Sequence, residues 1–209
     1  ILLAKNLTGY HNLVKIVSNA NLHGFYGRPR TDHSDLKRYH EGLICCSACI
    51  GGEVSQHILH NNLEAAEQAA KWHKSIFGED YYFELQLHRA TVENANHETG
   101  EIQAQVNEKL IELSRELGIK LICTNDVHFV EEEHAEAHDR LICLGTGKDL
   151  DDPKRMLYTK QEWMKTTKEM NEIFDYIPEA LTNTVEICNK IEGYSIDHAP
   201  IMPTFAIPE

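Results

Sequence analysis

Short apolar runs alternate along the chain with segments whose apolar residues recur at helical spacing. The runs cover residues 42–48 (GLICCSA), 81–87 (YYFELQL) and 120–126 (KLICTND), and residues 1–4 resemble the tail of another. The continuous run at residues 42–48 suits a strand that is buried on both faces. Residues 81–87 are rich in aromatic residues, and residues 120–126 contain the apolar run Leu121-Ile122-Cys123 directly after a helical segment. We therefore predict a strand at each of these four places.

Helical spacing is clearest in two segments between the runs. Residues 62–77 place Leu63, Ala66, Ala70 and Phe77 on one face, and Gly78 follows as a stop signal. Residues 106–117 form a second amphipathic segment that ends at Gly118. We also expect helices over residues 8–19, 131–144, 160–173 and from Pro178 onward, the last with Leu181, Val185, Cys188 and Ile191 on its apolar face.

Gly, Pro and polar residues mark the predicted connections. Residues 24–34 are expected to form a loop in which Asp32 or Ser34 caps a short helix. Residues 89–104 are polar and aperiodic, which indicates an exposed excursion, and residues 149–156 form another loop. The prolines of residues 198–209 predict an extended linker.

The order of elements predicts an α/β fold. Apolar strands that alternate with helices through short connections favour a parallel sheet with helical cover. A length of 209 residues suits one large domain or two small ones. Hydrophobic residues make up 42% of the chain and charged residues 25%, as in soluble globular proteins.

The net charge of −13 argues against a general DNA-binding module, because an acidic chain repels nucleic acid at long range. The best local exception is the basic stretch at residues 28–38, where Arg28 and Arg30 are candidates for phosphate or DNA contact. A solvated loop and a surface salt bridge are the simpler interpretations of these arginines.

Cysteine usage predicts a reducing, cytoplasmic compartment. Most of the six cysteines sit in apolar runs, as reduced buried thiols do, and no signal peptide accompanies them. No stretch approaches the roughly 18–20 apolar residues of a membrane span, so we expect no membrane partner.

Two predicted strands end in residue types that bind metals. Cys49 follows the first run, and Asp126 and His128 follow the third. Functional groups collect at the carboxyl ends of parallel strands, and side chains two apart on a strand point the same way. A thiolate, a carboxylate and an imidazole are ligands that zinc accepts at about 2.0–2.3 Å.

Each of these residues has an ordinary alternative. Cys49 suits a buried inert thiol, Asp126 a turn residue, and His128 a half-buried histidine. The metal interpretation depends on the three occurring together at two strand ends. Glu84 and His88 are weaker candidates for the same place, and the pair His134 and His138 is interpreted as a helix face.

Several stretches together resemble a known family. They include LLAKNLTGYHNLVKIVS, GFYGRPR, EGLICCSACIGGE, KLICTNDVHF and AEAHDRLICLGTGKDLDDPKRM. The sequence is similar to the PHP (polymerase and histidinol phosphatase) domain of bacterial DNA polymerase III alpha subunits, of the DnaE type. The resemblance covers nearly the whole chain except residues 89–104.

The resemblance implies a distorted (β/α)7 PHP barrel with a metal cluster at its mouth. Cys49 corresponds to the family's cysteine ligand, and Asp126 and His128 correspond to its last Asp-x-His pair. The family's opening His-x-His motif is absent, so we expect an incomplete barrel over residues 1–197 and a linker toward the polymerase palm over residues 198–209. The implied cofactors are divalent metals, Zn or Mn in this site and Mg in the polymerase domain.

The resemblance also implies a role in DNA synthesis during replication. The region would contribute metal ligands for phosphodiester hydrolysis, as in 3′–5′ proofreading, with DNA, a proofreading exonuclease subunit and the sliding clamp as partners. The alternative is a non-catalytic scaffold that binds the exonuclease subunit and stabilises the polymerase. A free-standing phosphoesterase is a third interpretation, disfavoured by the Pro-rich tail. The isolated piece is expected to be inactive and to self-associate.

Overall fold

The computed structural model describes residues 1–204, and the chain divides into two compact units. Unit 1 contains residues 1–2 and 44–189, and unit 2 contains residues 3–43 and the chain from residue 190 onward.

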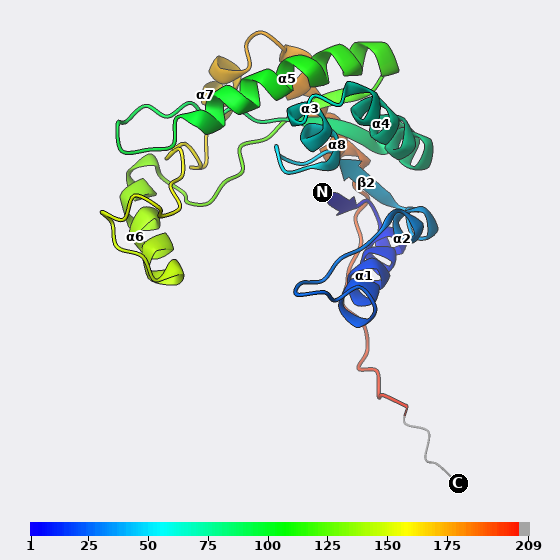
Figure 1. Cartoon of the computed structure of the whole chain (residues 1–209). Helices are drawn as coiled ribbons and strands as arrows, with labels where there is room; N and C mark the ends of the chain where they lie inside the picture. Colours follow the sequence, from blue (N-terminus) through cyan, green and yellow to red (C-terminus); the bar gives the residue numbers. More distant parts are fainter. Residues whose placement is uncertain (205–209) are drawn as a thin grey trace. The chain divides into compact units, whose positions relative to one another are not determined.

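Four strands form one sheet in the order β1-β2-β3-β4 (Figure 1). β2 pairs with β3 and β3 with β4, both in parallel. All four predicted strands are present, although β2, β3 and β4 end before the runs that predicted them. Their bounds are β1 (Leu2–Ala4), β2 (Leu43–Cys46), β3 (Tyr81–Leu85) and β4 (Lys120–Cys123).

The predicted parallel sheet and α/β class are confirmed, and helices connect the strands of unit 1. The described residues do not form a seven-stranded barrel. No helix within residues 1–204 combines the length and hydrophobicity of a membrane span. The helices of unit 1 are α3 (Glu53–Leu59), α4 (Leu63–Phe77), α5 (Glu98–Leu117), α6 (Ala135–Thr146), α7 (Thr167–Ile173) and α8 (Pro178–Lys190), with 3₁₀ turns η1 (Gly78–Asp80) and η2 (Glu132–His134).

The strands of unit 1 are buried on both faces, as their apolar runs predict. On one face, Ile44, Tyr82 and Ile122 form a cluster with Ile187 of α8. Tyr81 points to the opposite face, where its ring stacks on His73 of α4 at 5.2 Å between centroids. Alternation along a strand therefore supplies an apolar surface to a helix on each side of the sheet.

α4 follows its sequence pattern closely. The Asn62 side chain accepts the Ala65 N–H at the start of the helix, and Gly78 ends it with φ of +57°. Ala66 and Ala70 on the buried face have no exposed surface, which allows a close approach to the sheet.

α5 corrects the prediction of an exposed excursion over residues 89–104. The helix begins at Glu98, well before the apolar repeat that starts at Val106. Gly100 is buried, and a Cβ there would lie 2.6 Å from the His88 carbonyl oxygen. Buried Gln103 and Asn107 donate or accept hydrogen bonds with the chain that follows β3. This first part of α5 is therefore anchored by polar residues, which hydrophobic periodicity does not detect.

Two other predictions need correction. The helix expected over residues 160–173 begins only at Thr167, where Thr166 and Glu169 form a capping box. The buried residues of α8 are Ala180 and Ile187, whereas Val185 is 57% exposed. α8 packs on the sheet through the neighbouring face, where Glu186 accepts hydrogen bonds from Tyr82 and Lys120.

Unit 2 contains α1 (Leu7–Leu22) and α2 (His33–Arg38). α1 is longer than predicted at both ends. At its start, Asn6 caps the helix by accepting the Gly9 N–H. Asp32 caps α2 through the Asp35 N–H, as predicted. Residues 191–204 form no helix or strand, and the rest of the predicted linker lies outside the described residues.

The backbone of α1 approaches residue 42 closely in unit 2. A Cβ built on Gly9 would lie 1.9 Å from the Gly42 carbonyl oxygen, which also accepts the Lys5 N–H. We expect Gly9→Ala to lower the free energy of unfolding by about 1–3 kcal/mol through steric strain. Urea denaturation of the chain measures this change.

Gly145→Ala is the matched control. Gly145 lies inside α6, and a Cβ there meets nothing within 4 Å. Alanine should therefore stabilise this helix by about 0.5–1 kcal/mol. Equal effects of the two substitutions would contradict the close approach at Gly9.

Candidate metal site

A pocket of about 210 Å³ lies at the carboxyl ends of β2, β3 and β4 in unit 1. The chain that follows each of these strands contributes to its wall, together with α5 and residues 156–162. This is the place where parallel strands collect functional groups. The side chains in its wall that carry chemistry are Cys49, His88, Gln103, Asp126, Tyr158 and Glu162.

Cys49 differs from the cysteines inside the strands. Burial raises the pKa of Cys45 to about 11 and the pKa values of Cys46 and Cys123 to about 12, so these thiols are inert as predicted. The Cys49 side chain is exposed, and its sulfur accepts the Gly51 N–H at 3.4 Å. Ala48, with φ of +63°, turns the chain out of β2 immediately before it.

Asp126 reaches the pocket by a different geometry from the one expected. β4 ends at Cys123, and Asp126 has φ of +44°, so strand alternation does not extend to residues 126 and 128. Asp tolerates the left-handed conformation better than most residues. The Asn125 side chain fixes this turn by donating to the Trp163 carbonyl oxygen at 2.5 Å.

His128 is exposed and lies beside Tyr158. Its Nδ1 is 2.7 Å from the Asp126 carbonyl oxygen, and its Nε2 is 3.4 Å from the Tyr158 hydroxyl. A carbonyl can only accept, so Nδ1 carries the proton and Nε2 keeps its lone pair. That tautomer suits a metal ligand. The ring of His138 packs against both rings.

The structure brings together two of the three predicted ligands. Cys49 and Asp126 line the same pocket, while His128 lies next to the pocket residue Tyr158. Within the described part of the chain, the three side chains do not place one ligand atom each within 4.8 Å of one another.

His88 has a larger part in the pocket than its sequence position indicates. The side chain is 2% exposed, and its Nε2 donates to the Asn125 carbonyl oxygen at 2.9 Å. The side-chain oxygen of Gln103 accepts the backbone N–H of His88. The NH₂ group of Gln103 therefore faces His88 Nδ1, at 3.1 Å. Both ring nitrogens are therefore satisfied in the neutral form, and burial lowers the pKa of His88.

Glu84, the other weaker candidate, is buried below the pocket. Its carboxylate accepts the Thr124 hydroxyl at 2.5 Å, and its backbone N–H donates to the Ser47 hydroxyl at 2.9 Å. These bonds join β3 to the residues that directly follow β2 and β4. Glu84 thus supports the site from beneath.

Glu162 is the residue that sequence reasoning missed. Its side chain is 3% exposed and lines the pocket, while its carbonyl oxygen accepts the His128 N–H at 2.7 Å. A bridge between Phe129 and Trp163 runs the two segments in parallel. A single Glu in YTKQEWMK belongs to no motif, so only the fold reveals its position.

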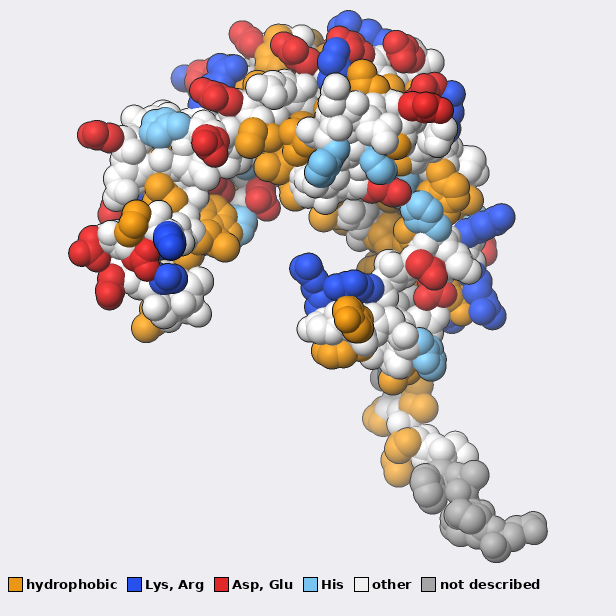
Figure 2. Space-filling model, in the orientation of Figure 1, with side chains coloured by type: hydrophobic (Ala, Val, Ile, Leu, Met, Phe, Trp, Pro, Cys, Tyr) orange, Lys and Arg blue, Asp and Glu red, His pale blue; other side chains and the backbone are white. Residues whose placement is uncertain are grey.

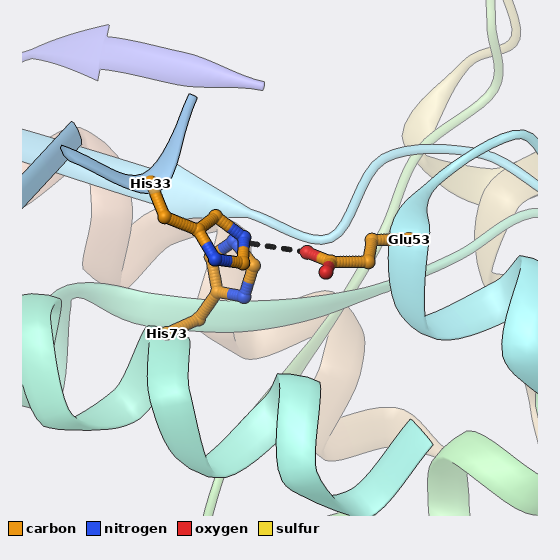
Figure 3. A group of neighbouring side chains, drawn as sticks. All are labelled: His33, Glu53 and His73. Atoms are coloured by element: carbon orange, nitrogen blue, oxygen red, sulfur yellow. Dashed lines mark ion pairs between the residues drawn. The ribbon is translucent and has the colours of Figure 1, made fainter. Parts of the chain in front are cut away.

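One histidine and one glutamate lie close together elsewhere in unit 1, away from the pocket residues named above (Figure 3). Glu53, at the start of α3, points toward His73 on α4, and the carboxylate lies 3.8 Å from His73 Nε2. The pair is a possible His/Glu metal site. His33, the third residue drawn, belongs to unit 2.

Arg28 and Arg30 lie on the exposed loop of unit 2, where Figure 2 shows Lys and Arg side chains. The Arg30 guanidinium lies 5.4 Å from the centre of the Tyr26 ring. Neither arginine forms an ion pair within residues 1–204. Their contact with phosphate or DNA stays a prediction.

Comparison with known families defines the class of protein. Residues 1–88 match the PHP domain family. PHP domains are a metal-dependent, phosphoesterase-type fold.

The relatives of the whole chain are more specific. It is 45% identical over its full length to the DNA polymerase III subunit alpha of Borreliella burgdorferi. It is 40% identical over 90% of its length to the protein of the same name from Campylobacter jejuni, and 37% identical over its full length to that of Treponema pallidum. The chain spans 16–17% of the length of these relatives.

The low pKa of His88 predicts a pH dependence of stability. The unfolded chain binds a proton at His88 below about pH 6.5, whereas the folded chain resists protonation. Stability should therefore be highest above pH 6.5 and fall with acidification, by at most about 1.4 kcal/mol per pH unit for this one group. His88→Gln should flatten this slope in urea denaturation with a chelator present.

His11→Gln is the matched control, because His11 is exposed on α1. It should leave the slope between pH 5 and 7 unchanged. The assignment to His88 fails if both variants keep the parent slope.

Proposed function

We propose that this chain is the PHP segment of a DNA polymerase III alpha subunit, and that Cys49, Asp126 and His128 bind a divalent metal ion, Zn or Mn. The observation that carries the proposal is the shared pocket of Cys49 and Asp126 at the carboxyl ends of β2 and β4. These residues are 77 positions apart in sequence, and parallel pairing through β3 brings their strands together.

The residues present fit a metal ion of this kind. The exposed thiol of Cys49, the carboxylate of Asp126 and the Nε2 lone pair of His128 are a donor set of the type that zinc prefers. A buried Glu162 oxygen without a hydrogen-bond donor lies in the same wall.

The chemistry proposed is phosphodiester hydrolysis at a DNA 3′ end. A bound divalent ion supplies charge stabilisation at the phosphate and a more acidic water. Cys49 would hold such an ion through its sulfur and Asp126 through its carboxylate. Tyr158 orients the His128 ring, and His88 holds the Asn125 carbonyl so that the turn at Asp126 keeps its shape. DNA polymerisation, which depends on Mg, would belong to the remainder of the protein.

Metal titration of the chain tests the ligand set. We expect binding of one or more equivalents of Co²⁺ with an absorption band from a thiolate–metal bond. Cys49→Ser should remove the band, and Asp126→Asn should weaken affinity by at least about 10-fold. Cys188→Ser is the control, because Cys188 is an exposed thiol far along α8. A band that persists in Cys49→Ser would contradict the assignment.

Nuclease activity tests the reaction. A full-length alpha subunit that carries this segment should release nucleotides from a DNA 3′ end, and Asp126→Ala combined with His128→Ala should abolish that release while polymerisation persists. Unchanged nuclease activity in the double variant would exclude this site as its source.

One observation favours the alternative function as a scaffold for a proofreading exonuclease subunit. α6 exposes Leu141 and Leu144, which are 64% and 80% accessible, and Figure 2 shows hydrophobic side chains on the surface over this helix. Exposed apolar residues of this kind mark protein contacts. On this alternative, Leu141→Ser with Leu144→Ser weakens subunit binding and leaves metal affinity unchanged.

A further inference from the structure

Glu162 has a buried carboxylate, and only one of its two oxygens accepts hydrogen bonds from the chain. Its Oε1 accepts the Thr159 N–H at 3.1 Å and the Thr159 hydroxyl at 2.6 Å. Its Oε2 is fully buried and has no hydrogen-bond partner within the described residues. A buried charged oxygen without a partner is unfavourable, so it points to a missing positive or donating group.

Neighbouring cations do not donate a hydrogen bond to this oxygen. The Lys165 ammonium attracts the Glu162 carboxylate electrostatically, but it donates to the Gln161 carbonyl oxygen and lies over the Trp163 ring. Lys160 instead pairs with Glu136. Glu162 itself lines the pocket, together with Cys49 and Asp126.

The backbone holds Glu162 in a fixed relation to the predicted ligands. Its carbonyl oxygen accepts the N–H groups of His128 and Phe129, at 2.7 and 3.3 Å. The Met164 N–H donates back to the carbonyl oxygens of Phe129 and Val130, both at 3.1 Å. These backbone bonds hold residues 162–164 beside the segment that contains His128. The backbone of Glu162 is therefore fixed relative to that of His128.

We propose that Glu162 is a further carboxylate ligand of the divalent metal ion in this pocket. Thr159 holds one oxygen and leaves Oε2 to bind the cation. This proposal rests on the proposed metal site of Cys49, Asp126 and His128 and extends it to a residue outside the family motifs named above. It also explains why Glu162 Oε2 has no hydrogen-bond partner although Oε1 of the same carboxylate accepts two hydrogen bonds from Thr159.

The competing explanation is a purely structural carboxylate that orders the turn at Thr159. The two roles predict different effects of Glu162→Gln on metal affinity. Glutamine keeps the volume and the Oε1 acceptor for Thr159, but it removes the unpartnered negative oxygen. If Glu162 serves the metal, the variant should bind metal more weakly, while the metal-free variant should melt at the same temperature as the parent chain or higher. A purely structural role, which glutamine preserves through Oε1, predicts an unchanged metal affinity.

The experiment measures Co²⁺ and Zn²⁺ affinity and the melting temperature, with and without metal, for the 209-residue chain. We expect Glu162→Gln to weaken metal affinity by about 100-fold or more and to reduce the metal-dependent rise in melting temperature. Glu172→Gln is the control, since this carboxylate is 65% exposed on α7 and should change neither quantity.

A second variant keeps the proposal testable if Glu162→Gln does not fold. Thr159→Val retains the carboxylate but removes the hydroxyl that orients it, and it should weaken metal affinity by about 10-fold. Parent-like metal affinity in a folded Glu162→Gln, or in Thr159→Val if only that variant folds, would overturn the role of Glu162 alone. Absence of metal binding by the parent chain would overturn the proposed site itself.

Discussion

Parallel pairing of β2, β3 and β4 is the constraint on which the candidate site depends. It aligns the carboxyl ends of three strands at one edge, so that chain segments far apart in sequence open into one pocket. The pairing is stabilised by burial on both faces, with Phe83 and Tyr82 having no exposed surface. The Glu84 backbone N–H then donates to the Ser47 hydroxyl, and the Glu84 carboxylate accepts the Thr124 hydroxyl, which joins the three strand ends to one another.

A second layer of polar contacts shapes the pocket above this edge. Gln103 fixes the His88 tautomer, His88 holds the Asn125 carbonyl, and Asn125 reaches across to the Trp163 carbonyl. This chain of bonds connects α5, the turn at Asp126 and the segment around Glu162. The unusual backbone at Asp126 is therefore supported on both sides, which is how functional residues keep strained conformations.

Apolar patterns predicted the strands, α4 and the strand-end location of the site, because burial on both faces leaves continuous runs in the sequence. They failed where polar residues do the anchoring. The first part of α5 depends on Gln103, and the segment that approaches His128 depends on backbone bonds to Glu162. Cys49 and Asp126 were predicted from residue type and strand position, whereas Glu162 lies outside any strand end or motif. Its place is set by the parallel bridge of Phe129 and Trp163, which joins two irregular segments.

X-ray absorption spectroscopy of the zinc-loaded chain tests the central claim most directly. The account predicts one sulfur scatterer at about 2.3 Å, from Cys49, together with nitrogen and oxygen scatterers at about 2.0–2.2 Å. The sulfur signal should vanish in Cys49→Ser. A first shell of nitrogen and oxygen alone in the parent chain would show that Cys49 does not share an ion with the other ligands, and would contradict the account.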